Sequence, residues 1–290
     1  MDVTMPIENV VVRPMTSSDL MNALSMTQAL HWPHTYQDWD QIVSLGPSLV
    51  MEIDGDMIGT ACLVPQGDYA SVGLIVISDQ YQGHGLGRRI MHDIMDCAAT
   101  DSYFYLTATE MGKPLYKKLG FVEYNVIEQY QNTVSSKDIT LVQPIANADI
   151  RTYQTKDYDR LHSLINAATG MDRKAILDLM LRVSSHTLVV SDDGEITGFA
   201  MYRPFGRGFS IGPVIADCTQ NALALISSLL KNADGEFVRL DIINQYPETG
   251  KMLTEWGLAK VDTVSQMVKG KVPEVNGHFK QFGLVTQAIG

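Results

Sequence analysis

The sequence predicts an α/β fold in which helices flank a mixed β-sheet, and it predicts this unit twice along the chain. Three observations support the prediction: a strand that runs into a helix at the start of each half, a β-hairpin in each half, and an apolar segment around a glycine late in each half. All three recur in the same order, at offsets of 137 to 139 residues. We interpret this repeat as the duplication of one α/β unit.

The first repeated feature lies in Val12–Leu20 and again in Ile150–Tyr158. In both segments a short apolar strand leads into Ser, Thr and Asp residues, which are typical of a helix start. Charged residues also match at the same offset, since Arg13 corresponds to Arg151 and Asp19 corresponds to Asp157.

The second repeated feature is a β-hairpin in Leu49–Ala61 and in Leu188–Ala200, where an Asp-Gly turn separates two apolar runs. After this antiparallel hairpin, each half alternates strands with helices, which predicts parallel strands in that part of the sheet. Each unit is therefore expected to contain a strand, one or two helices, the hairpin, a third strand, a helix, a strand, a helix and a last strand.

The third repeated feature pairs Leu119–Phe121 with Trp256–Leu258. Between the two units, the polar stretch Gln131–Asp138 has the composition of a linker. We therefore expect an N-terminal domain of residues 1–133 and a C-terminal domain of residues 134–290.

Composition excludes several classes of protein. Of the 290 residues, 45% are hydrophobic and 19% charged, which is typical of a folded globular chain. No apolar stretch approaches the roughly 20 residues of a membrane span, and the first residues lack the basic segment of a secretory signal. The cysteines Cys62, Cys97 and Cys218 form no CxxC pair, so neither a disulfide framework nor a metal site is expected. These features predict a cytoplasmic protein with no membrane contact.

The charge is distributed unevenly. Residues 1–135 contain 16 acidic and 6 basic residues, whereas residues 136–290 contain 17 and 16. An acidic first half is either an ordinary solvated surface or a field that attracts a cationic small molecule. No cluster of Lys and Arg is interleaved with aromatic residues, so we do not expect nucleic-acid binding.

A glycine-rich turn lies between a predicted strand and a predicted helix. The apolar run Gly73–Ile77 leads into Ser78–Arg89, and Ile90–Met95 has helical spacing. Glycines at a helix N-terminus let backbone N–H groups converge on a phosphate. The turn contains neither the Gly-Lys-Ser/Thr of a Walker A loop nor the G-x-G-x-x-G of a dinucleotide loop.

The turn fits the pattern Q-x-x-G-x-G through Gln82, Gly85 and Gly87, with Arg88 following. This resembles the acetyl-CoA signature of the GNAT N-acetyltransferases. A second element, Leu115–Phe121, is similar to the Leu-Tyr-x-x-x-Gly-Phe segment of the same family. The resemblance implies tandem GNAT folds and acetyl-CoA as cosubstrate.

The resemblance also implies roles for matching residues. Backbone amides of the glycine turn would hold the pyrophosphate, the strand before it would pair with the pantetheine arm, and Tyr116 would donate a proton to the departing thiolate. The implied cosubstrate-binding residues are Leu74, Ile75, Val76, Ile77, Gln82, Gly83, His84, Gly85, Leu86, Gly87, Arg88 and Thr109. Thr109 stands where many relatives have Asn, and Tyr69–Leu74 lacks the Glu that many relatives use as general base.

The acceptor site is predicted from two regions. In the first half, Leu30–Asp40 crowds aromatic and polar groups around a proline, and from it we select Trp32, His34 and Asp38 as candidate acceptor contacts. In the second half, Arg173 and Arg203 are candidates to bind a substrate carboxylate. An amino acid or a similar zwitterion would suit this combination.

The second half lacks the cosubstrate motif. In the corresponding segment, Phe209–Ala222, the strand is followed by Ala-Asp-Cys-Thr and not by a Gly-x-Gly turn. Leu253 stands where the first half has Tyr116. We therefore expect a degenerate GNAT-like domain that completes the acceptor pocket.

The sequence thus predicts an N-acetyltransferase that acts on a primary amine of a small molecule by direct attack in a ternary complex. Two alternatives remain open: a protein or peptide N-acetyltransferase, and a non-catalytic acyl-CoA-binding sensor. A homodimer is compatible with each.

Overall fold

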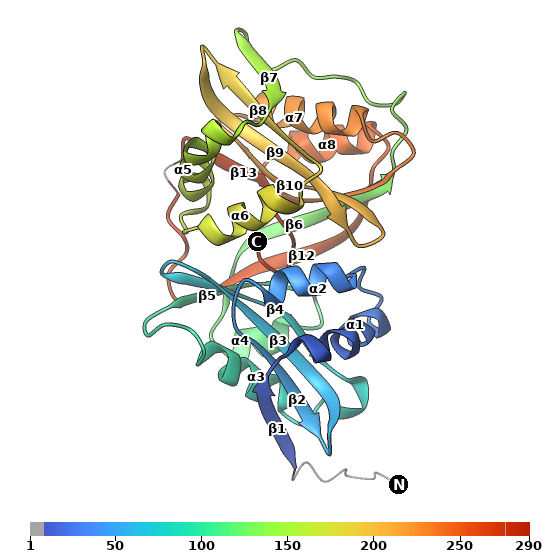
Figure 1. Cartoon of the computed structure of the whole chain (residues 1–290), viewed down its shortest axis with the longest axis vertical. Coiled ribbons are helices and arrows are strands. Elements are labelled where there is room, and N and C mark those ends of the chain that lie inside the picture. The colour runs from blue at the N-terminus through green and yellow to red at the C-terminus, as the bar shows by residue number, and fades with distance from the viewer. Residues whose placement is uncertain (1–8, 276) are drawn as a thin grey trace.

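The computed structural model describes residues 9–275 and 277–290, which form two lobes stacked along the long axis of the molecule (Figure 1). The first half of the chain begins with a strand and two helices, followed by a three-stranded antiparallel region. Its elements are β1 (Val10–Pro14), α1 (Leu20–Ala29), α2 (Tyr36–Val43), β2 (Ser48–Ile53), β3 (Asp56–Gln66), β4 (Tyr69–Ile77), α3 (Leu86–Met95), β5 (Tyr103–Ala108), α4 (Lys113–Lys118) and β6 (Val122–Thr133).

The second half repeats this order and adds a short last strand. Its elements are β7 (Ala148–Thr152), α5 (Tyr158–Thr169), α6 (Lys174–Val183), β8 (His186–Asp192), β9 (Glu195–Phe205), β10 (Gly208–Ala216), α7 (Thr219–Lys231), β11 (Phe237–Ile243), α8 (Pro247–Glu255), β12 (Ala259–Lys269) and β13 (Lys280–Gly283). Both predicted hairpins are present, with the Asp and Gly of each turn at positive φ. That geometry matches the right-handed twist of the flanking strands.

All described strands belong to one mixed sheet in the order β1-β2-β3-β4-β5-β12-β6-β11-β13-β10-β9-β8-β7. Parallel pairing is present, as predicted, between β4 and β5 and between β10 and β11. The prediction was wrong for the last long strand of each half, because β6 and β12 pair antiparallel with β11, with β5 and with each other. The mixed α/β fold and the repeat are therefore confirmed. The predicted linker was placed too early, because β6 continues through Thr133.

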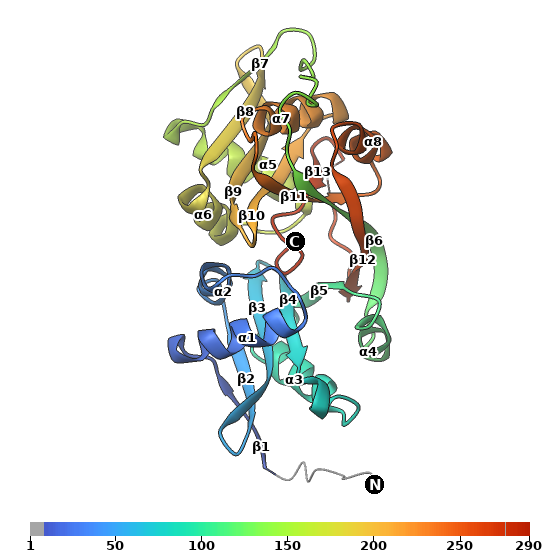
Figure 2. The same ribbon diagram turned by 90° about the vertical axis from the view of Figure 1, so that its right-hand side faces the viewer.

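The two halves exchange their last long strands. β6 of the first half pairs with β11 of the second, and β12 of the second half pairs with β5 of the first. β6 and β12 also pair with each other, and Figure 2 shows them crossing together from one lobe to the other. Each lobe is thus completed by a strand from the other half, so the division at residue 133 follows the chain but not the hydrogen-bonded sheet.

A shared apolar core joins the lobes. It contains buried residues of α1 and α2, such as Leu20 and Trp39, together with residues of α5 and α6, such as Leu164 and Leu177. Separate cores lie beneath α3 in the first lobe and beneath α7 and α8 in the second. Because apolar burial is the main favourable term in folding, the shared core fixes the lobes against each other. Among the described residues, no helix is long and apolar enough to cross a membrane.

Candidate active site

The strand β4 has an open edge. It pairs with β5 only from Tyr69 to Ser71, so the peptide groups of Val72–Ile77 lack a strand partner on that side. On the other side, the register with β3 shifts between Thr60 and Cys62, and the hydroxyl of Thr60 donates to the carbonyl of Leu74 (2.8 Å). Leu74 has a φ of 50°, which is unusual for a residue with a side chain. This irregular strand exposes backbone groups that a ligand can pair with.

A cavity of about 800 Å³ lies along this edge. Residues of both halves line it, including β4, the glycine turn and α4 of the first lobe and side chains of β9, β11 and β12 from the second. Figure 1 places the C-terminus between the two lobes, and Thr286, Gln287 and Ala288 of this last segment also line the cavity.

The glycine turn presents unobstructed backbone at the start of α3. Gly83 and Gly85 both have a φ of 81°, and a Cβ added at either would meet nothing within 4 Å. No side chain caps the helix, so its first N–H groups are open to a ligand. The Gln82 side chain donates to the Ile77 carbonyl (3.0 Å) and to Asp79 (3.0 Å), which ties the turn to the strand.

Most of the predicted cosubstrate residues lie on the cavity wall. They are Leu74, Ile75, Val76, Ile77, Gln82, Gly83, Gly85, Leu86, Gly87, Arg88 and Thr109. His84 is exposed and does not line the cavity. Thr109 accepts a hydrogen bond from the Gly112 N–H (3.3 Å) and thereby helps to start α4.

Tyr116 lines the cavity from α4 and is buried. Burial raises the pKa of its hydroxyl, so the group keeps its proton at neutral pH. The ring packs edge-on against Phe121 and passes close to Gly112, where a Cβ would come within 2.8 Å of the ring. No hydrogen bond of the Tyr116 hydroxyl is found within residues 9–275 and 277–290, so the hydroxyl is available to a bound molecule.

Two of the three predicted contacts from the first half line the cavity. Trp32 and His34 do so, while the carboxylate of Asp38 accepts from the Thr35 (2.8 Å) and Gly206 (3.1 Å) N–H groups. Burial lowers the pKa of His34 to about 4, and its ring lies edge-on to Phe205. His34 is therefore neutral at neutral pH, and its Nδ1 has no hydrogen-bond partner among the described residues.

The two arginines selected from the second half lie behind the cavity wall. Arg173 donates to the carbonyls of Ile289 (2.8 Å) and Gly290 (3.2 Å), and Arg203 donates to the carbonyl of Val285 (2.9 Å). Neither guanidinium lines the cavity. Both hold the C-terminal segment in place, because buried carbonyls need donors.

Besides Arg88, two further arginines line the cavity, and neither was predicted from the sequence. Arg207 lies in the turn between β9 and β10, and Arg239 lies in the middle of β11. The sequence does contain a pattern that could have identified Arg239. Arg239 and Asp241 are charged residues two apart in the otherwise apolar strand Phe237–Ile243, which places both on one face of it.

In the described part of the second half, the place equivalent to the open edge of β4 is occupied. In the first lobe the space beside β4 is open, but in the second β13 lies between β10 and β11 and fills it. The backbone of this segment approaches closely, since a Cβ at Gly212 would lie 1.9 Å from the carbonyl oxygen of Leu284. The second half therefore retains the fold without room for a cosubstrate at the equivalent place.

Comparisons with known proteins agree with this architecture. Two family models described as acetyltransferase (GNAT) domains match residues 45–123 and 161–282. The uncharacterized N-acetyltransferase YitH of Bacillus subtilis is 27% identical over 240 residues, which cover 82% of this chain and 83% of that protein.

Solved structures extend the similarity across the whole chain. A putative acetyltransferase from Pyrococcus horikoshii aligns with a TM-score of 0.78 at 17% identity, covering 100% of this chain and 99% of that one. A tandem GNAT protein from the clavulanic acid biosynthesis pathway aligns with a TM-score of 0.66 at 12% identity, covering 91% and 99%. The chain belongs to the GNAT superfamily as a two-domain N-acetyltransferase.

Proposed function

We propose that the protein transfers the acetyl group of acetyl-CoA to a primary amine of a small molecule, by direct attack while both substrates are bound. The observation that carries this proposal is the single cavity that joins the glycine turn, the open edge of β4 and Tyr116 to side chains of the other half. Proximity of two bound substrates supplies much of the rate enhancement of such a reaction without a covalent intermediate.

The cosubstrate would be held by backbone groups. N–H groups from Gln82 to Arg88 would bind the pyrophosphate at the start of α3, and the space around Gly83 and Gly85 supports this role. The unpaired peptide groups of Leu74–Ile77 would bind the pantetheine arm, with an amide near Val76 polarising the thioester carbonyl.

Tyr116 would donate a proton to the departing thiolate. Its buried hydroxyl retains the proton at neutral pH and has no partner in the described part of the chain. The amine must lose a proton before or during its attack. No carboxylate or imidazole lies on β4, so that proton would leave through water or through a group on another element.

The test is release of free thiol from acetyl-CoA with a panel of small amines and short peptides. Tyr116→Phe should reduce turnover by about 100-fold or more while leaving acetyl-CoA affinity unchanged. Tyr246→Phe is a matched control, since Tyr246 is partly buried in the second lobe and does not line the cavity.

The outcomes separate the alternatives. A protein that binds acetyl-CoA but releases no thiol with any acceptor would be a sensor. Turnover confined to peptides would indicate protein or peptide acetylation. Turnover that Tyr116→Phe leaves intact would remove Tyr116 from the mechanism.

A further inference from the structure

The exchanged strands give the cavity a polar wall. β6 lies between β12 and β11, and Arg239 of β11 is opposite Gln131 of β6. Two residues further along β11, Asp241 is opposite Gln129, which in turn is opposite Asp262 of β12. Residues two apart on a strand, and residues directly opposite across strands, share a face of the sheet. All of these except Asp241 line the cavity.

Arg239 is held rigidly in this wall. Its Nε and Nη2 donate to the two carboxylate oxygens of Asp241 (3.0 and 2.9 Å), and Gln287 also donates to Asp241 (2.9 Å). The guanidinium carbon lies 5.5 Å from the centre of the Phe205 ring. One edge and one face of the guanidinium are thus fixed, and its Nη1 donates no hydrogen bond within the described chain. A planar group fixed in this way is preorganised to bind an oxyanion such as a carboxylate or a phosphate.

Arg207 adds a positive charge from the second half to the same cavity, which Arg88 and Lys118 line from the first half. It is exposed, its guanidinium carbon lies 5.0 Å from the centre of the Phe237 ring, and it forms no ion pair with any residue that the structure describes. Asp241 already balances the charge of Arg239, so the charge of Arg207 remains for a ligand. A ligand without acceptor atoms at these donors would leave them unpaired once water is displaced, and an ionised acceptor forms the stronger hydrogen bonds to a guanidinium.

We propose that Arg239 and Arg207 bind an oxyanion of the amine acceptor, so that the acceptor is an amine that also carries a carboxylate or a phosphate. This inference rests on the proposed acetyltransferase function and adds the class of its second substrate. Asp262 and Gln131 supply further polar contacts to the same molecule from the neighbouring strands. The specificity residues therefore come from strands on both sides of the exchange, while the cosubstrate residues come from the first half.

The test compares matched pairs of acceptors that differ in the oxyanion. Amino acids are compared with their amides, and glucosamine 6-phosphate with glucosamine, by the rate of thiol release from acetyl-CoA. We expect kcat/KM to be at least about 10-fold higher for the charged member of one pair, as for a charge-assisted hydrogen bond. A preference for amino acids over their amides would indicate a carboxylate, and a preference for glucosamine 6-phosphate over glucosamine would indicate a phosphate.

Two variants connect the preference to the residues. Arg207→Gln changes an exposed side chain, and the double replacement Arg239→Gln with Asp241→Asn removes both charges of a buried pair, so neither remains unpaired. Each should raise the acceptor KM and reduce the preference about 10-fold, with the KM for acetyl-CoA unchanged. Arg182→Gln is the control, because Arg182 is exposed on α6 and lies away from the cavity.

Equal turnover of both members of every pair, or an unchanged preference in both variants, would overturn the inference and leave the proposed function intact. If no acceptor is turned over, the inference is tested by binding: the same pairs are titrated calorimetrically into the complex of the protein with CoA. Binding of a charged member that the variants lose supports the inference, and binding of no charged member overturns it. Failure to bind acetyl-CoA would overturn the proposed function itself.

Discussion

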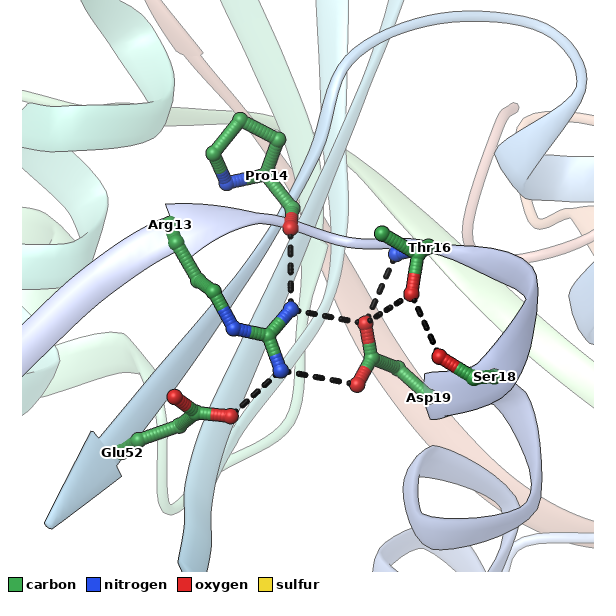
Figure 3. Close-up of polar contacts among 6 residues, drawn as sticks. All are labelled: Arg13, Pro14, Thr16, Ser18, Asp19 and Glu52. Atoms are coloured by element: carbon green, nitrogen blue, oxygen red, sulfur yellow. Dashed lines mark hydrogen bonds and ion pairs between the residues drawn. The ribbon is translucent and has the colours of Figure 1, made fainter. Parts of the chain in front are cut away.

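Arg13 binds the carboxylate of Asp19 through two parallel hydrogen bonds of 2.8 and 2.9 Å (Figure 3). The same arrangement recurs in the second half, where Arg151 binds Asp157 at 2.7 and 3.0 Å. Each pair joins the first strand of its half to the helix that follows. In both, the aspartate also accepts the backbone N–H three residues before it, at the turn into the helix. The two halves therefore share an ion pair as well as a fold.

Replacing Asp19 by Asn should destabilise the protein. Asp19 is buried and accepts hydrogen bonds from Arg13 and from both the N–H and the hydroxyl of Thr16. We expect a loss of about 2 kcal/mol in the free energy of unfolding, measured by urea denaturation at pH 7. Asp93→Asn is the control. Its 3.8 Å pair with Arg89 is exposed, and its loss should cost less than about 0.5 kcal/mol.

The effect of Asp19→Asn should depend on pH with a defined sign. Hydrogen bonds from Arg13 lower the pKa of Asp19 in the folded protein. The stabilisation is therefore fully present above the unfolded pKa of about 3.9 and is lost as the pH falls further. A difference between the two proteins that did not shrink between pH 4 and pH 2 would contradict this account.

Local features of the molecule could be predicted from the sequence because they depend on nearby residues. The Asp-Gly turns, the glycine turn at α3 and the Arg–Asp repeat are all of this kind. The strand exchange could not be predicted, because the alternating pattern of β6 and β12 specifies which face is buried but not which strand lies alongside.

The acceptor site was predicted less well, for the same reason. Arg173 and Arg203 were selected as arginines near the ends of elements, but both bind carbonyls of a segment more than 80 residues away in sequence. Arg239 lies opposite Gln131 only because β11 pairs with an exchanged strand. A long-range pairing of this kind leaves no mark in local sequence.

The glycines of the turn before α3 provide a test of cosubstrate binding. Gly83→Ala or Gly85→Ala places a methyl group in the open space where the pyrophosphate is proposed to bind, at a φ of 81°. The backbone strain should cost about 1 kcal/mol, and acetyl-CoA affinity should fall at least about 10-fold. Gly235→Ala is a matched control, with a φ of 78° and equally open space in the second lobe. A similar fall in affinity in the control would rule out a specific role for the turn.

His34 should make the protein less stable in mild acid. Burial lowers its pKa to about 4, with Asp38 and Asp241 opposing the shift and Arg239 and Arg203 adding to it. Between the unfolded pKa of about 6.5 and the folded value, the unfolded chain binds the extra proton, so stability falls as pH falls. The expected loss from this group is about 2 kcal/mol at pH 5 relative to pH 7.5.

His34→Gln provides the comparison, since it lacks the titrating ring. Its stability measured by urea denaturation should change less over the same range than that of the unaltered protein. Parallel curves for the two proteins would show that another group is responsible for the acid sensitivity.

Gly73 tests the position of the C-terminal segment. A Cβ at this residue would lie 2.5 Å from the carbonyl oxygen of Ala288, so Gly73→Ala requires the segment to move. We expect a loss of about 1–3 kcal/mol in stability. The acceptor KM should also rise, because Thr286, Gln287 and Ala288 line the cavity. An unchanged melting temperature together with an unchanged KM would contradict the close approach of the two segments.

The carbonyl of Ile289 connects this segment to both halves. It accepts from Arg173 of the second half (2.8 Å) and from the hydroxyl of Tyr105 of the first (2.8 Å). Loss of one donor leaves the buried oxygen with the other, whereas loss of both leaves it unpaired. Arg173→Met and Tyr105→Phe should therefore be non-additive. In a double-mutant cycle measured by urea denaturation, the double variant should lose about 1 kcal/mol more than the sum of the single losses. Strict additivity would show that the two donors act on the segment independently.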